Sequence, residues 1–234
     1  MISWWGWIGL LAMAAAACDR EPEPPSAGPP AGSAVDPRGR VVFLGTSLTA
    51  GLGLDPSQAY PALLQQKMDS AGLPFVAVNA GVSGETSAGA RRRVDWLMRE
   101  PAAALVIETG ANDGLRGLDV DSLEANIQAI IDRARQQAPP PKIVLVGMRA
   151  PPNLGAGYAR RFDAAYAELA RRNGVALVPF LLEGVAGVDS LNQADAIHPT
   201  TAGQRRIAET VWPVVEGVLD GRSEGRAVRP ADDQ

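Results

Sequence analysis

The segment that most constrains the fold is a short apolar run that stops at a glycine. It reads Val41-Val42-Phe43-Leu44-Gly45 and is followed at once by Thr46 and Ser47. A continuous apolar run of this length, without alternation, is typical of a strand buried on both faces in a parallel sheet. Ser47 would then lie at the carboxyl end of the strand, the edge where open α/β sheets bind ligands. The segment alone leaves two interpretations of Ser47, a nucleophile or a helix cap.

Strands and helices alternate along the rest of the chain from Arg40 onward. Short apolar runs predict four further strands, at residues 75–78, 104–108, 143–146 and 176–178. The segments between them carry apolar residues at helical spacing. Alternation of this kind predicts a parallel sheet covered by helices. We therefore predict an α/β fold built on a five-stranded parallel sheet.

Three of the predicted helices have distinct features. Asp121 and Glu124 have the form of a capping box at the start of the helix that carries Leu123 to Ala134. Pro213 lies inside the last helix and should kink or split it. Two of the helices have an apolar face that we interpret as core. One face consists of Leu123, Ile127, Ile130, Ile131 and Ala134, and the other of Tyr158, Phe162, Ala165, Tyr166 and Leu169.

The pattern of residues 1–18 predicts an export signal. An apolar stretch rich in tryptophan runs into four alanines and Cys18. It is too short to span a bilayer comfortably, and small residues precede its end, as a cleavage site requires. Small residues before a cysteine resemble a bacterial lipoprotein signal, in which the cysteine is lipidated and becomes the mature N-terminus. The alternative is ordinary cleavage after an alanine, with Cys18 as a bystander.

The remaining terminal segments differ in composition from the predicted folded part, residues 39–219. Residues 19–38 are rich in proline and glycine and predict a linker, because proline removes hydrogen-bond donors and fixes φ. Residues 220–234 are polar and lack periodicity, which predicts a disordered tail. A linker after a lipidated Cys18 would hold the domain away from a membrane. We therefore expect an exported, periplasmic protein that is anchored as a lipoprotein.

Composition excludes several classes of function. The net charge is −4, which argues against a nucleic-acid-binding surface. With one cysteine and one histidine, the chain forms no internal disulfide and no Cys/His zinc cluster. Any histidine chemistry must use His198. The run Arg91-Arg92-Arg93 predicts a solvated helix face, with anion binding as the less favoured alternative.

Three more polar segments follow predicted strands or precede helices, at residues 79–86, 108–114 and 195–199. A serine nucleophile needs a base, and imidazole exchanges a proton near neutral pH. Asp195 lies three residues before His198, so it can hold the other ring nitrogen. The Asn112 side chain and the backbone N–H groups of Ser47 and Gly84 can donate to an oxyanion. Each segment alone is also an ordinary turn or cap; the four together indicate catalysis.

In this order the segments resemble the SGNH, or GDSL, hydrolase family, which is named for one residue in each. Here these are Ser47, Gly84, Asn112 and His198, with Asp195 completing a triad. The resemblance covers residues 40 to about 217. It is greatest for the branch of bacterial periplasmic thioesterase I / lysophospholipase and related arylesterases, on residues 45–54, 112–117 and 195–199, and residues 149–155 look like that branch's substrate-side loop. Thr46 departs from the family, which has aspartate there.

The resemblance implies a flavodoxin-like three-layer α/β/α fold and hydrolysis through an acyl-Ser47 intermediate. It implies no metal and no cofactor. The expected substrate is a small acyl ester or thioester, and we expect a monomer. Two alternatives stay open: a carbohydrate O-acetyl esterase, and a non-catalytic lipoprotein that only binds a ligand.

Overall fold

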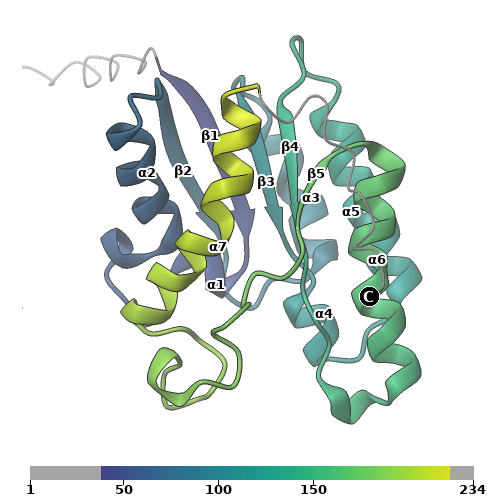
Figure 1. The fold of residues 1–234 in the computed structure, drawn as a ribbon. Helices are drawn as coiled ribbons and strands as arrows, with labels where there is room; N and C mark the ends of the chain where they lie inside the picture. Colours follow the sequence, from purple (N-terminus) through teal and green to yellow (C-terminus); the bar gives the residue numbers. More distant parts are fainter. Residues whose placement is uncertain (1–37, 222–234) are drawn as a thin grey trace, which may run out of the picture. The chain divides into compact units, whose positions relative to one another are not determined.

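The computed structural model describes residues 38–221, so the predicted signal, most of the linker and most of the tail lie outside the described residues. The five strands in this part form one parallel sheet in the order β2-β1-β3-β4-β5 (Figure 1). This is the flavodoxin-like order, and it confirms the predicted fold class. The strands are β1 (Gly39–Gly45), β2 (Phe75–Gly81), β3 (Ala104–Glu108), β4 (Lys142–Val146) and β5 (Ala176–Val178).

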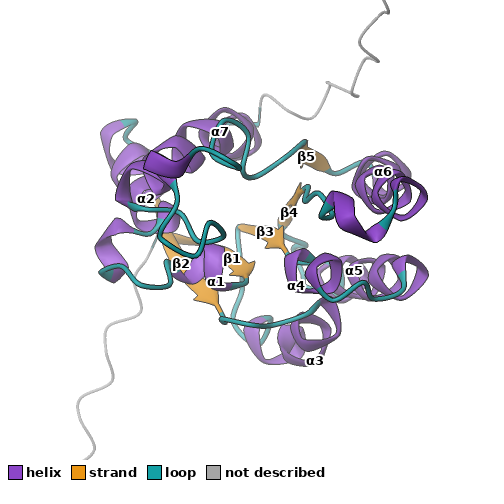
Figure 2. Cartoon of the chain, turned by 90° about the horizontal axis from the view of Figure 1, so that it is seen from below, coloured by secondary structure: helices purple, strands orange, loops and turns teal. Residues whose placement is uncertain are grey.

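Helices cover both faces of the sheet, which completes the three layers (Figure 2). On one face lie α2 (Tyr60–Ser70) and α7 (Thr201–Leu219), and on the other α3 (Ser87–Leu97), α5 (Val120–Ala134) and α6 (Ala156–Asn173). Two short helices follow strand ends, α1 (Ser47–Ala50) after β1 and α4 (Ala111–Leu115) after β3. Single 3₁₀ turns occupy Pro56–Gln58, Pro152–Leu154 and Asp189–Leu191. Among the helices of residues 38–221, none has the length and apolarity to cross a membrane.

The central strands explain the apolar runs in the sequence. β1 pairs with β2 on one side and β3 on the other, so that Leu44 faces Ala80 and Ile107. The side chains of Val41 to Leu44 are completely buried because helices cover both faces. Since all strands run the same way, their carboxyl ends meet at one edge, where the polar segments of the sequence gather.

The apolar stripes of α5 and α6 are buried as expected, apart from the partly buried Tyr158, but the start of α5 differs. Asp119 caps it: its carboxylate accepts the Ser122 N–H at 2.9 Å. The predicted capping box of Asp121 and Glu124 is therefore wrong. Asp119 is extended and the helix begins at Val120, so Asp121 lies inside the first turn, where it pairs with Arg161.

The last helix is not split at Pro213. α7 continues from Thr201 to Leu219, and Pro213 is exposed to solvent. An exposed position is the one where a helix tolerates proline, because water can satisfy the carbonyl left without a partner. The helix therefore keeps its buried face, from Ile207 to Val218, in one piece.

Candidate active site

Three side chains predicted from sequence lie in hydrogen-bonding contact at the carboxyl edge of the sheet. Nε2 of His198 is 2.9 Å from Oγ of Ser47, and Nδ1 of the same ring is 2.6 Å from Oδ2 of Asp195. Ser47 is the first residue of α1, directly after β1, and His198 lies in the loop before α7. The fold thus joins a hydroxyl, an imidazole and a carboxylate that come from opposite ends of the domain.

The imidazole is held by a tight turn. Oδ1 of Asp195 accepts the backbone N–H groups of Ile197 and His198, each at 3.0 Å. Between them Ala196 has φ of 56°, a left-handed conformation that is uncommon for a residue other than glycine. The hydrogen bond to the His198 ring, aided by the two backbone bonds, lowers the pKa of Asp195. The carboxylate therefore stays ionised and fixes the orientation of the ring.

Exposure falls from the carboxylate to the hydroxyl. The Asp195 side chain is 46% exposed and the His198 side chain 17%, while Ser47 is 9% exposed. Ser47 and His198 are thus largely shielded from bulk water, whereas the Asp195 carboxylate is open to solvent. Such an arrangement can move the Ser47 proton to His198 without a long solvent path.

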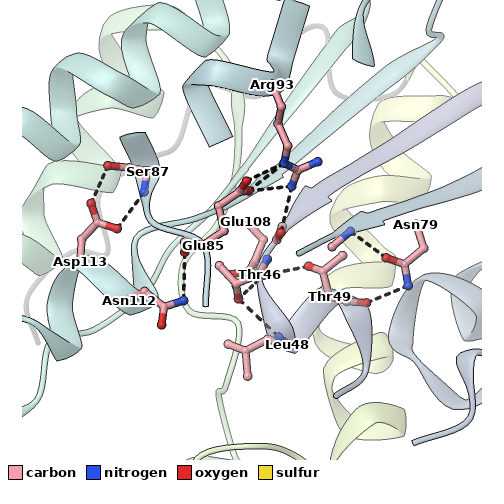
Figure 3. Close-up of polar contacts among 12 residues, drawn as sticks. Thr46, Leu48, Thr49, Asn79, Glu85, Ser87, Arg93, Glu108, Asn112 and Asp113 are labelled. Atoms are coloured by element: carbon pink, nitrogen blue, oxygen red, sulfur yellow. Dashed lines mark hydrogen bonds and ion pairs between the residues drawn. The ribbon is translucent and has the colours of Figure 1, made fainter. Parts of the chain in front are cut away.

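A buried carboxylate lies behind the serine turn, and no pattern in the sequence pointed to its role. Glu108 ends β3 and accepts the Thr46 N–H at 2.8 Å, the Thr46 hydroxyl at 3.0 Å and the Thr49 hydroxyl at 2.8 Å (Figure 3). It has no ion-pair partner within residues 38–221 and is completely buried. Burial raises the pKa of Glu108, and the three donors act in the opposite direction. We call Thr46, Thr49 and Glu108 the serine-turn clamp.

The serine-turn clamp explains Thr46 and Gly45. Thr46 also caps α1, since its Oγ1 accepts the Leu48 N–H at 3.3 Å. A Cβ on Gly45 would lie 2.0 Å from Thr49 Oγ1 and 2.7 Å from Glu108 Oε2, so only glycine leaves room for the clamp. Thr46, the position where the chain departs from the family pattern, therefore orders the turn that presents Ser47.

The three proposed oxyanion donors differ in what they already bind. The backbone N–H groups of Ser47 and Gly84 have no hydrogen-bond partner in the described part of the chain. Asn112 Nδ2 donates one hydrogen to the Glu85 carbonyl at 2.9 Å, which leaves its second hydrogen available. Gly84 has φ of 76° with open space around its Cβ position, so glycine is required there by conformation.

Two arginines, Arg93 and Arg116, hold the loop that carries Gly84. Arg93 makes a bidentate ion pair with Glu85, with N–O distances of 2.7 to 2.9 Å, and also donates to the Gly45 carbonyl at 3.2 Å (Figure 3). Arg116 donates to the Gly84 carbonyl at 3.1 Å. The expectation that residues 91–93 are all solvated is therefore wrong for Arg93, because the α3 face that bears it turns toward this loop.

Asp113 ties the start of α3 to the same region. Its carboxylate accepts the Ser87 N–H at 2.8 Å and the Ser87 hydroxyl at 2.5 Å (Figure 3). Asp113 follows Asn112 directly, so one short helix anchors the neighbouring loop through both residues. The sequence offered only the Asn-Asp pair as a signal. Cys18, the predicted lipidation site, lies outside the described residues.

Comparison with known proteins places this geometry in context. Residues 43–206 match the model of the GDSL-like lipase/acylhydrolase family. The chain is 43% identical over 180 residues to esterase TesA of Pseudomonas aeruginosa, covering 76% of this chain and 89% of that protein. It is 35% identical over 170 residues to thioesterase 1/protease 1/lysophospholipase L1 of Escherichia coli, covering 72% and 79%.

Solved structures agree with the sequence comparison. The crystal structure of TesA matches with a TM-score of 0.73 and covers 76% of this chain and 99% of that one, at 43% identity. The psychrotrophic esterase EstA from Pseudoalteromonas sp., in a structure inhibited by monoethylphosphonate, matches with a TM-score of 0.72 at 33% identity, covering 77% of this chain and 98% of that one.

Proposed function

The chain belongs to the GDSL-like lipase/acylhydrolase family and is an ester hydrolase, and from this premise we propose that it cleaves acyl esters or thioesters through an acyl-Ser47 intermediate. The observation that carries the proposal is the contact chain from Ser47 Oγ through His198 to Asp195, at 2.9 and 2.6 Å. A molecule that only bound a ligand would need neither a base nor a group that orients it.

In the proposed first step His198 Nε2 takes the Ser47 proton while Oγ attacks the carbonyl carbon. The tetrahedral intermediate collapses, the bond to the leaving oxygen or sulfur breaks, and His198 returns the proton to the leaving group. A water molecule, deprotonated by His198, then releases the acid and restores Ser47. Asp195 stabilises the imidazolium that forms in each half of the reaction.

The oxyanion would be held by the N–H groups of Ser47 and Gly84 and by the Asn112 amide. Support comes from their free donor capacity in the described residues and from the contacts that fix them, Arg116 on Gly84 and the Glu85 carbonyl on Asn112. Donors that are already positioned need no reorganisation when charge develops on the substrate oxygen.

The names of the relatives support the substrate class. They include an esterase, an arylesterase of Vibrio mimicus and an enzyme named both thioesterase and lysophospholipase. The Pseudoalteromonas esterase was crystallised inhibited by monoethylphosphonate, and a phosphonate has the tetrahedral shape of the intermediate that attack by a serine forms. Oxygen and sulfur esters therefore both fall within the proposal, with acetylated sugars as the alternative substrates.

We further propose that the protein is exported and held at a membrane by a lipid on Cys18. This proposal rests on the apolar segment before Cys18 and on the proline-rich segment after it. The active-site edge of the domain would then work outside the cytoplasm.

The test is hydrolysis of p-nitrophenyl acetate and butyrate by wild type, Ser47→Ala and the matched control Ser70→Ala, whose side chain is exposed on α2. We expect Ser47→Ala to lose activity and Ser70→Ala to keep it. A serine-directed fluorophosphonate should add its mass to the peptide that contains Ser47. Activity that survives in Ser47→Ala, or an unlabelled Ser47, contradicts the mechanism. A series of acyl chain lengths, with acyl-CoA and an acetylated sugar, then separates the substrate classes.

A further inference from the structure

A hollow of about 430 Å³ lies on the side of the Gly84 loop that faces α3. Residues 82–86, Gly89 and the side chains of Arg92, Arg93 and Arg116 line it, and we call it the arginine recess. It opens to solvent, and the Val82 side chain, 44% exposed, contributes an apolar wall. Nothing in the proposed chemistry uses Arg92.

The arginine recess carries an excess of positive charge. Arg93 is neutralised by its bidentate ion pair with Glu85. Arg116 has no carboxylate partner within residues 38–221, and its hydrogen bond goes to the neutral Gly84 carbonyl. Arg92 is exposed and has neither a hydrogen bond nor an ion pair in this part of the structure. Two guanidinium groups therefore remain uncompensated in a chain whose net charge is −4.

The arginine recess adjoins the reaction centre. The Gly45 carbonyl accepts the Val82 N–H at 2.9 Å and Arg93 at 3.2 Å, which packs the strand end before Ser47 against this loop. Arg116 lies 3.1 Å from the carbonyl of Gly84, whose N–H is a proposed oxyanion donor. An anion in the recess would thus lie within about three residues' extended span, on the order of 10 Å, of the carbonyl under attack.

The chemistry of the lining indicates the kind of anion. Guanidinium groups bind phosphate through paired N–H donors, and two of them match a group with several charged oxygens better than a single carboxylate. Simple acyl chains carry no charge, so the anion must belong to the alcohol or thiol side of the substrate. The Val82 side chain can pack against the methylene groups that link the phosphate to the ester.

We propose that the arginine recess is a subsite for a phosphate group on the substrate's leaving group, with Arg92 and Arg116 as its ligands. This inference rests on the proposed ester and thioester hydrolysis. It applies equally to a phosphorylated alcohol, such as a glycerol phosphate ester, and to a phosphorylated thiol, such as a phosphopantetheine thioester.

The experiment compares matched substrates that differ only by the phosphate. One pair is butyryl glycerol phosphate and butyryl glycerol; the other is S-butyryl phosphopantetheine and S-butyryl pantetheine. The ratio of kcat/KM within each pair is measured for the full-length wild type, Arg92→Gln and the matched control Arg91→Gln. Arg91 is the neighbouring exposed arginine, lies outside the recess and contacts Asn126. Arg116 is not substituted because it also positions Gly84.

We expect wild type to prefer the phosphorylated member of at least one pair, and the pair that shows the preference identifies alcohol or thiol. Because Arg92 is exposed and partly screened, Arg92→Gln should lower the ratio about threefold to tenfold, and Arg92→Glu should lower it further. Arg91→Gln should leave the ratio unchanged. Inorganic phosphate should raise KM for the phosphorylated ester and not for its neutral partner.

Two outcomes overturn the subsite. The first is the same ratio of kcat/KM, phosphorylated over neutral substrate, in wild type and in Arg92→Gln. The second is a fall of this ratio in Arg91→Gln as large as the fall in Arg92→Gln, which would indicate only a general surface potential. Failure of the proposed function looks different, because neither member of either pair would be cleaved. Binding is then read without turnover, from backbone amide shifts of residues 82–86 when inorganic phosphate is added to Ser47→Ala. Shifts that Arg92→Gln abolishes support the subsite, and their absence refutes it.

Discussion

Glu108 offers the most direct test of how the fold presents Ser47. Its carboxylate accepts three buried donors of the serine-turn clamp, the Thr46 N–H, the Thr46 hydroxyl and the Thr49 hydroxyl. Two substitutions of similar volume separate hydrogen bonding from charge. Glu108→Gln can keep one oxygen at the Oε2 position for the Thr46 N–H and the Thr49 hydroxyl, while its amide donates to Thr46 Oγ1. Glu108→Leu removes every acceptor.

Glu108→Leu and Glu108→Gln should lower stability by different amounts, because the Thr46 N–H cannot rotate toward another acceptor. A buried donor left unpaired costs about 1–3 kcal/mol, and the Thr46 N–H belongs to a fixed backbone. The two hydroxyls can rotate, and Thr49 retains the Tyr60 hydroxyl at 2.8 Å. Loss of the buried carboxylate, whose pKa burial raises, offsets part of the cost. We therefore expect Glu108→Leu to lower the free energy of unfolding by about 2–4 kcal/mol and Glu108→Gln by about 1 kcal/mol or less.

The kcat of each Glu108 variant should fall with the displacement of the turn that carries Ser47. A shift of about 1 Å in Ser47 relative to His198 costs on the order of 10²-fold in rate. Urea unfolding gives the stability of each variant, and turnover of p-nitrophenyl butyrate, measured well below the unfolding transition, gives kcat. Equal stability of the two variants, or wild-type kcat in Glu108→Leu, would refute the role of the serine-turn clamp.

Three further predictions rest on contacts of Glu108, Asn112 and Asp195, and a fourth rests on the sequence around Cys18. The folded protein keeps a proton on Glu108 at pH values where the unfolded chain has lost it, so this group lowers the stability of the wild type as pH rises from the unfolded pKa through the raised folded pKa. Urea unfolding from acid to neutral pH should therefore show the free energy of unfolding of wild type falling relative to that of Glu108→Gln. Parallel curves of stability against pH for the two proteins would contradict this prediction. Asn112→Ala should lower kcat on p-nitrophenyl butyrate by about 10²–10³-fold, as expected for loss of an oxyanion donor, and should cost about 1 kcal/mol of stability because the bond to the Glu85 carbonyl is lost; a change in KM alone would exclude that role. Asp195→Asn should lower kcat by about 10³–10⁴-fold, because the amide holds the wrong tautomer of the His198 ring; a variant that retains a tenth of the activity would show that the ring needs no orienting carboxylate. Cys18→Ser should move the full-length protein from the detergent phase to the aqueous phase, and the same phase for both proteins would exclude the lipid anchor.

Sequence patterns predicted the framework because the forces behind it are local. A strand buried on both faces must be apolar throughout, and a helix on a core must repeat its apolar residues every third or fourth position. The five strands therefore followed from apolar runs, and the buried faces of α5 and α6 followed from helical spacing. The contact of His198 with Asp195 and Ser47 was also expected, since the chain has one histidine and an aspartate three residues before it.

The support around the site was decided by the tertiary structure. Glu108 meets Thr46 across 62 residues because β1 and β3 are neighbours in the sheet. Arg93, which its run of three arginines suggested to be solvated, turns toward Glu85 and Gly45 because α3 packs over that strand end. Neither contact has a signal in local spacing, since a hydrogen bond depends on which segments the sheet order places side by side. The sequence by itself predicted the residues that we propose to react; the packing of β1, β3 and α3 decided what holds Ser47 in place.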